Sequence, residues 1–152
     1  MRIFRSFLSL VLILVTTLLV SCSSPTQAKV PTVYTPEKIA QLEAFVEPID
    51  TAREKMATLK ELIEQENWVD TRTFIHGPLG SLRQDLRILS SKLLPKDQGT
   101  AQKIAKELFS HFERIDAAAK DRNAGLAETQ YVEAIKDFDA FLDLIPQSGD
   151  NS

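Results

Sequence analysis

Apolar residues recur every three, four or seven positions through most of the chain after residue 36, the spacing that aligns side chains along one side of an α-helix. The clearest stripe lies between Asn67 and Pro95. It consists of Trp68, Ile75, Leu79, Leu82, Leu86, Leu89 and Leu93. A stripe this long and narrow is typical of a helix packed lengthwise against several others. We expect Trp68 to be buried where this helix begins, closing one end of the fold.

Three other segments carry the same helical period: residues 36–65, 100–122 and 126–145. Thr35 followed by Pro36 is a typical helix start, with Thr as the cap. Pro48 lies inside the first segment and removes a backbone hydrogen bond, which predicts a kink. Gly77-Pro78 interrupts the second segment without changing the register of its stripe. That segment is therefore either one bent helix or a short helix followed directly by a longer one.

The connections between these segments are short. Glu66-Asn67 reads as a turn, residues 95–99 as a loop, and Asn123-Ala124-Gly125 as a turn, because Asn and Gly tolerate a left-handed backbone. No strand pattern competes after residue 36. Four amphipathic helices joined in this way predict an all-α fold, an antiparallel up-down-up-down four-helix bundle over residues 36–146. Residues 147–152 are expected to be a disordered tail.

The N-terminal region reads as an export signal. Residues 1–21 combine Arg2 and Arg5 with an apolar run from residue 7 to 20. Fourteen helical residues cover ~21 Å, less than the ~30 Å of a membrane core, so a permanent span is the weaker interpretation. The run ends in Leu19-Val20-Ser21-Cys22, which resembles the bacterial lipobox. The alternative is an ordinary signal with an incidental cysteine.

If the segment is a lipobox, lipid is attached to Cys22, which then becomes the first residue of the mature protein. Cys22 is the chain's only cysteine. Its acyl chains would anchor the protein to a membrane. Residues 22–35 are polar and contain proline, and they are expected to form a flexible tether. The thirteen residues after Cys22 reach at most ~45 Å, so the folded part would work close to the membrane surface.

Composition places the chain among single globular domains, with 152 residues, 43% hydrophobic and 26% charged. The formal net charge is −3, and the part after the signal holds 16 basic and 21 acidic residues. A nucleic-acid-binding protein would normally show a strong basic excess, so that class is excluded.

The charges are unevenly spread. Residues 36–66 hold eight acids and four bases, and residues 124–145 hold five acids and one base. Neighbouring first and fourth helices would then share an acidic wall. Arg72, Arg83 and Arg87 lie on the flank of the second helix and are candidate contacts to an acidic partner. The alternative is that this polarity only aids solubility.

Catalytic patterns are missing from the sequence, so we expect no enzyme. His76 and His111 lie on different predicted helices, and a di-iron bundle would need Glu where Thr73 and Leu108 stand three residues earlier. They are weak candidates for metal ligands and are better explained as surface or boundary residues. No covalent-heme motif, phosphate-binding glycine loop or EF-hand pattern occurs.

The segment NWVDTRTFIHGPLGSLRQDLRILSSKLLPKDQ, with YTPEKIAQLEAF before it and ERIDAAAKDRN after it, resembles the PsbQ-like lipoproteins of cyanobacteria. These are relatives of the PsbQ extrinsic subunit of photosystem II, and the resemblance spans nearly the whole mature chain, lipobox included. It implies a four-helix bundle on the lumenal side of the thylakoid membrane. Plant PsbQ has a longer proline-rich N-terminal region and no lipid anchor, and this sequence differs from it there.

The resemblance also implies a function. The chain would bind the lumenal face of photosystem II, beside other extrinsic subunits and the core antenna, and stabilise the oxygen-evolving complex. It would support retention of calcium and chloride there indirectly, with no cofactor of its own beyond the lipid on Cys22. A different class remains open, a carrier lipoprotein that binds a small ligand or metal in or at the end of the bundle.

Overall fold

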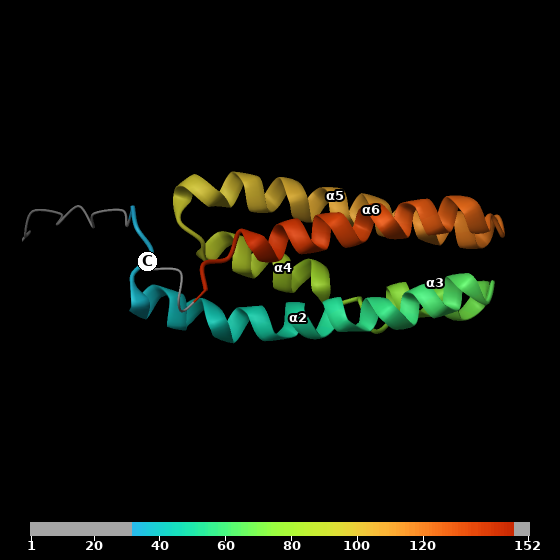
Figure 1. Cartoon of the computed structure of the whole chain (residues 1–152), viewed down its shortest axis with the longest axis horizontal. Coiled ribbons are helices and arrows are strands. Elements are labelled where there is room, and N and C mark those ends of the chain that lie inside the picture. Colours follow the sequence, from blue (N-terminus) through green and yellow to red (C-terminus); the bar gives the residue numbers. More distant parts are fainter. Residues whose placement is uncertain (1–31, 148–152) are drawn as a thin grey trace, which may run out of the picture. The chain divides into compact units, whose positions relative to one another are not determined.

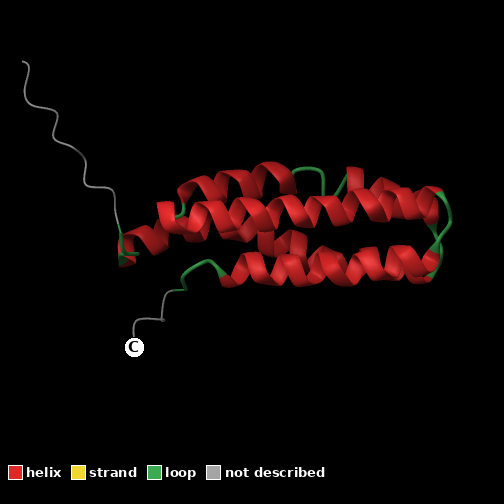
Figure 2. Ribbon diagram, turned by 90° about the horizontal axis from the view of Figure 1, so that it is seen from above, coloured by secondary structure: helices red, strands yellow, loops and turns green. Residues whose placement is uncertain are grey.

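The computed structural model describes residues 32–147. The predicted signal peptide, Cys22, the tether up to residue 31 and the tail from residue 148 lie outside the described residues. Within residues 32–147 there are five α-helices and no strand. Figure 1 and Figure 2 show how the helices are arranged. The helices are α2 (Pro36–Glu64), α3 (Trp68–His76), α4 (Leu82–Lys92), α5 (Pro95–Lys120) and α6 (Ala124–Asp143). The all-α class is therefore confirmed.

Two long helices, α2 and α5, each contact α3, α4 and α6. Because α3 and α4 both pack between α2 and α5, together they take the place of the predicted second helix. The first and last helices, α2 and α6, are neighbours, as the predicted acidic wall requires. Helix α2 continues through Pro48 without interruption.

The break between α3 and α4 confirms the two-helix alternative at Gly77-Pro78. Residues 77–81 form successive turns, in which the Gly80 N–H donates to the Gly77 carbonyl at 2.9 Å. A Cβ added at Gly80 would lie 2.7 Å from the carbonyl oxygen of His76, closer than side chains tolerate. Glycine at position 80 therefore permits the tight turn that starts a second helix in register with the first.

The core follows the predicted stripes. In the stripe between Asn67 and Pro95, the residues from Leu79 to Leu93 are at most 3% exposed, and they pack with α2, α5 and α6. Trp68 departs from expectation, because it packs against the core but is only partly buried. Phe141 is fully buried although the α6 pattern did not single it out. It lies between Phe138 on α6 and Ile145 just beyond the end of that helix, at helical steps of three and four residues, so the buried stripe runs through Phe141, and the predicted Leu142 is only partly buried.

The predicted loop at residues 95–99 is wrong, because α5 begins at Pro95. Leu94 has an extended backbone (φ −62°, ψ 148°) and Pro95 is the first helical residue, where its missing N–H leaves no hydrogen bond unmade. The Gln98 side chain donates to the Leu93 carbonyl at 2.9 Å, which closes the α4–α5 corner. Pro95 is thus the start of α5 and not part of a loop.

Tyr34, within the predicted tether, fixes the start of the described chain to the same corner. Its hydroxyl donates to Asp97 Oδ2 at 2.8 Å and accepts from the Leu94 N–H at 3.1 Å. Burial, together with the neighbouring Asp97 carboxylate, raises the pKa of Tyr34 to about 12. Thr35 caps α2 as expected by accepting from the Lys38 N–H at 3.2 Å. The chain therefore leaves the helices from a defined point beside α4 and α5.

Two turns share one design. Glu66 (φ 50°) and Arg122 (φ 54°) adopt left-handed backbones, and each is followed by an Asn that caps the next helix. Asn123, for example, accepts from the Leu126 N–H at 3.0 Å. The expectation that Asn123-Ala124-Gly125 supplies the left-handed turn is thus wrong by one residue, because Asn123 is needed as the cap and Gly125 is already helical.

This design gives a stability prediction. Replacing Arg122 with glycine removes the Cβ that makes a left-handed backbone costly, and it should raise the free energy of unfolding by about 0.5–1 kcal/mol in urea melts. Asp121 is the matched control, since its backbone is right-handed (φ −85°, ψ 0°) and glycine there should lower stability. Equal effects at both positions would contradict the strain at Arg122.

Candidate docking surface

The first functional candidate, Arg72, lies on α3 and is paired with α5. Its Nε donates to Asp116 Oδ1 at 3.0 Å, and His76 Nε2 lies 3.0 Å from the same oxygen. Burial favours the neutral carboxyl of Asp116, but the hydrogen bonds from Arg72 and His76 outweigh it and lower its pKa. Asp116 is therefore a carboxylate that holds α3 against α5, and part of the charge of Arg72 is neutralised within the chain.

Arg83, on α4, is also engaged with α5. Its Nη2 donates to Glu113 Oε1 at 3.2 Å, and its guanidinium carbon lies 4.2 Å from the centre of the Phe109 ring. Both partners of the ion pair are mostly solvent-exposed, so the pair contributes little to stability. The contact with the Phe109 ring also places the guanidinium of Arg83 against α5.

Arg87 differs from the other two arginines. It is exposed on α4, one turn beyond Arg83, and makes no hydrogen bond, ion pair or ring contact with any residue between 32 and 147. Arg72, Arg83 and Arg87 thus share one side of the molecule, as the sequence predicted, but Arg87 alone of these three has its full charge free for a partner. Their role in binding stays a prediction.

Two hollows lie along the line where α3 and the start of α4 meet α5, which we call the α3–α5 seam. One, of about 720 Å³, is lined by Trp68, Val69, Arg72, Thr73, His76, Gly77, Ala119, Lys120 and Arg122. The other, of about 360 Å³, is formed around Arg83 and Phe109 and shares His76 with the first. Val69 is 76% exposed, and no acidic side chain lines the larger hollow. Sequence patterns did not single out Val69, Lys120 or Arg122, although an apolar residue on the polar side of a helix is a signal that could have found Val69.

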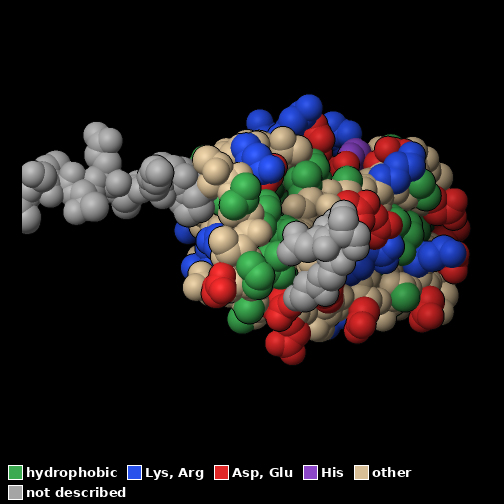
Figure 3. Space-filling view, turned by 60° about the vertical axis from the view of Figure 1, so that its left-hand side comes forward, with side chains coloured by type: hydrophobic (Ala, Val, Ile, Leu, Met, Phe, Trp, Pro, Cys, Tyr) green, Lys and Arg blue, Asp and Glu red, His purple; other side chains and the backbone are tan. Residues whose placement is uncertain are grey.

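The opposite side, where α2 meets α6, is the predicted acidic wall. Figure 3 shows Asp and Glu side chains gathering along the lower edge of one face, whereas Lys and Arg lie together with some Asp and Glu along its upper edge. Cations interrupt the wall, however. Arg53 Nε lies 2.6 Å from Asp139 Oδ1 and Lys60 Nζ lies 3.4 Å from Glu64 Oε1. The wall is thus more mixed than the segment charges suggest.

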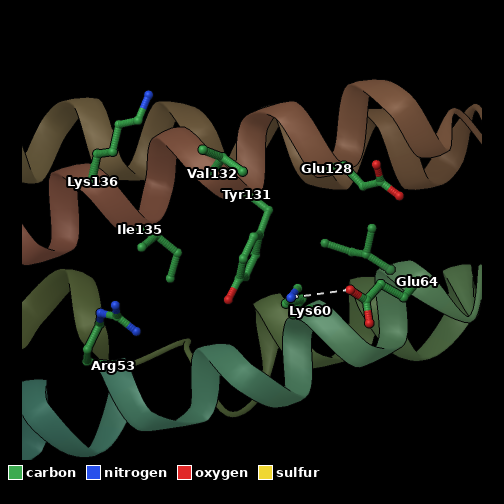
Figure 4. Close-up of a pocket in the computed structure, with 9 residues that line it drawn as sticks. Arg53, Lys60, Glu64, Glu128, Tyr131, Val132, Ile135 and Lys136 are labelled. Carbon is green, nitrogen blue, oxygen red and sulfur yellow. Dashed lines mark ion pairs between the residues drawn. The ribbon is translucent and has the colours of Figure 1, made fainter.

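A groove of about 520 Å³ opens between these helices (Figure 4). Tyr131 points from α6 across it, and its hydroxyl donates to the Met56 carbonyl at 3.1 Å. Burial raises the pKa of Tyr131. Val132, 50% exposed, and Ile135 supply apolar surface beside the tyrosine. This groove is the place in the described chain that best suits the carrier alternative.

Neither histidine belongs to a metal-binding cluster in the described chain. His76 faces Asp116, and His111 lies between Gln130 and Asp137. No group of three or more His, Cys, Asp or Glu side chains within residues 32–147 is arranged to hold a metal ion. Cys22 lies outside the described residues. None of the described helices is both long and apolar enough to span a membrane.

Comparison with known proteins gives the family. The family model PsbQ, described as oxygen evolving enhancer protein 3, matches residues 4–146. The chain belongs to the PsbQ family. It is also 61% identical over 145 residues to CyanoQ of Synechocystis sp., an alignment that covers 95% of this chain and 97% of CyanoQ. The PsbQ match spans all five helices, so the α3–α5 seam and the α2–α6 groove both lie inside the family region.

Proposed function

We propose that this chain is an extrinsic subunit of photosystem II on the lumenal side of the thylakoid membrane. It stabilises the oxygen-evolving complex and supports its retention of calcium and chloride, without catalysing a reaction. The observation that carries this proposal is membership of the PsbQ family, with 61% identity to CyanoQ over nearly the whole chain. The family description, oxygen evolving enhancer, supports a role beside water oxidation.

The fold in this proposal is the antiparallel up-down-up-down four-helix bundle, with α3 and α4 as one broken helix. Ion pairs between helices support the antiparallel order of α3 and α4 relative to α5, because a later residue of the first segment pairs with an earlier residue of α5. Arg72 of α3 pairs with Asp116 of α5, and Arg83 of α4 pairs with the earlier Glu113. Such a bundle offers long outer helix faces for binding a partner.

Binding is the means by which a protein of this kind acts. A subunit that binds only the assembled complex stabilises that state by mass action. The α3–α5 seam supports such binding, because it combines the partly buried Trp68, the exposed Val69 and several cations. Aromatic and arginine side chains are enriched among residues that dominate binding energy. The proposed partners are acidic surfaces of the other extrinsic subunits and the core antenna.

Attachment to the membrane is a further part of the proposal. Cys22 carries lipid, and residues 22–35 connect it to α2. The contacts of Tyr34 with Leu94 and Asp97 support a fixed exit point for this connection. Growing the cells with a radioactive fatty acid should label the mature protein, with Cys22→Ser as the unlabelled control. An unlabelled mature protein would eliminate the anchor and leave the docking proposal standing.

Deleting the gene provides the functional test. Oxygen evolution should stay near normal in complete medium, because the chain supplies no catalytic group. Depleting calcium or chloride should lower oxygen evolution more in the mutant than in the wild type, and the other extrinsic subunits should wash off more readily. Adding the protein back should reverse both effects. Equal behaviour of mutant and wild type under ion depletion would contradict the role in ion retention.

The carrier function is the second candidate, and the α2–α6 groove is the observation that favours it. Its volume and its apolar residues Tyr131, Val132 and Ile135 suit a small amphipathic ligand. A visible absorption band or a co-purifying small molecule would support the carrier. Substituting Val132 with Glu should then abolish ligand binding while leaving photosystem II binding unchanged.

A further inference from the structure

Helix α3 has the weakest apolar attachment to the bundle. Each of the other four described helices contributes at least four buried residues, whereas the one buried residue of α3 is the polar Thr71. Its apolar side chains Trp68, Phe74 and Ile75 pack against the core but are only partly buried. Because the burial of apolar surface is the main force that holds a helix in a fold, α3 is held less firmly than its neighbours.

The polar attachment of α3 depends on a single carboxylate. Arg72 Nε donates to Asp116 Oδ1 at 3.0 Å, and His76 Nε2 lies 3.0 Å from the same oxygen. The hydroxyls of Thr71 and Thr73 instead donate to backbone carbonyls one helical turn earlier, so they stabilise only the helix itself. Within residues 32–147, Asp116 is therefore the one side chain of another helix that hydrogen-bonds to α3.

The space between α3 and α5 is also incompletely filled. The two hollows of the α3–α5 seam, of about 720 Å³ and about 360 Å³, share His76 in their linings, so they adjoin at a residue that contacts Asp116. Side chains that border empty space lose dispersion contacts on that side. Trp68 and Ile75 line one hollow each, which agrees with their partial burial.

Both ends of α3 are joined to the bundle by turns. Glu66 before it has a left-handed backbone (φ 50°), and residues 77–81 after it form successive turns. The helix has only nine residues, and helices shorter than about 12–15 residues are marginal when isolated in water. Once separated from α5, α3 would therefore unravel between these two turns, while the long helices α2 and α5 keep their other contacts.

We propose that α3 is a flap, which opens by local unfolding while the other four described helices stay folded, and which a partner bound at the α3–α5 seam closes. Segments with few buried apolar contacts commonly open at a lower free energy than the whole domain. An acidic partner surface that contacts Val69 and Arg72 on α3 together with Lys120 on α5 binds only the closed arrangement. Such a partner shifts the population toward the closed flap.

The closing step rests on the proposed function, whereas the opening step is a property of the free chain. Hydrogen exchange of the free mature protein, followed by mass spectrometry of short peptides, tests the opening. Relative to their intrinsic rates, the amides of α3 should exchange at least tenfold faster than those of α4, a helix of similar length that follows it directly. Equal protection of α3 and α4 would overturn the flap.

A pair of matched variants tests the role of Asp116. Asp116→Ala removes both hydrogen bonds to α3, so it should accelerate the exchange of α3 a further three- to tenfold and leave α6 unchanged. Asp139→Ala is the control, because it removes the 2.6 Å contact of Arg53 with Asp139 between α2 and α6. It should leave the exchange of α3 unchanged. An unaltered α3 in Asp116→Ala, or equal acceleration in the two variants, would overturn the proposal.

Rebinding to washed photosystem II membranes tests the closing step. On binding, the exchange of α3 should slow at least tenfold, while that of α6 changes by less than threefold. A bound chain whose α3 exchanges as fast as in the free protein would overturn the closing step and leave the assignment to photosystem II standing. A chain that fails to bind these membranes would contradict the proposed function as well.

Discussion

Replacing Phe138 with alanine is expected to lower the free energy of unfolding by about 3–5 kcal/mol, the usual cost of truncating a fully buried large aromatic. Phe138 is 0% exposed in the C-terminal half of α6 and belongs to the core shared with α2, α4 and α5. The loss combines the burial of the ring with the cavity it would leave. Urea unfolding followed by circular dichroism measures it.

Val132 is the matched control on the same helix. Because it is 50% exposed, Val132→Ala should change stability by less than about 0.5 kcal/mol. Trp68→Ala should fall between the two, since Trp68 is partly buried and its indole is not enclosed by the core. A loss below about 1 kcal/mol for Phe138→Ala would mean that α6 does not pack on the core as described.

The second large effect concerns binding. Reversing the charge of Arg87 with glutamate is expected to weaken photosystem II binding about three- to tenfold, because it places a like charge against an acidic partner. Arg87 is the choice among the three arginines because it has no partner within residues 32–147, so its reversal breaks no internal pair. Reversing Arg72 or Arg83 would instead set a new carboxylate beside Asp116 or Glu113. Rebinding to washed photosystem II membranes, at several salt concentrations, measures the effect.

Lys55→Glu is the control for net charge. Lys55 is exposed on α2, and its substitution changes the charge of the protein by the same amount. It should leave the affinity within about twofold of the wild type and keep its salt dependence. Arg87→Glu should also reduce that salt dependence. Equal losses in the two variants would attribute the effect to net charge alone, and the arginine flank would then serve only solubility.

Much of this fold could be predicted from the sequence because apolar periodicity encodes which side of each helix is buried. The stripe keeps its register across Gly77-Pro78, from Ile75 to Leu79 and Leu82, for that reason. Prediction failed where one residue serves two local roles. The sequence indicates a loop at Pro95, although proline is also a preferred first residue of a helix. The sequence also indicates a left-handed turn at Asn123. Because Asn123 caps α6, the left-handed backbone falls on Arg122 instead.

The site was less predictable, because it depends on how the helices are rotated against one another. The sequence placed Arg72, Arg83 and Arg87 on one side, but it could not reveal that Asp116 and Glu113 of α5 lie opposite the first two. Nor could it bring His111 of α5 to Asp137 of α6, since these two residues are 26 positions apart and meet only through the packing of two helices. Cys22 remains a prediction from the lipobox pattern.

The central claim is that this chain is a subunit of photosystem II, and co-purification tests it most directly. Photosystem II would be isolated through an affinity tag on a core subunit, after mild detergent solubilisation of thylakoid membranes, and the bound proteins identified by mass spectrometry. The account predicts that this chain is recovered with the complex, in reduced amount for Arg87→Glu, and is released by high salt. Absence of the wild-type protein from every active photosystem II fraction, with all of it in unrelated membrane fractions, would contradict the account.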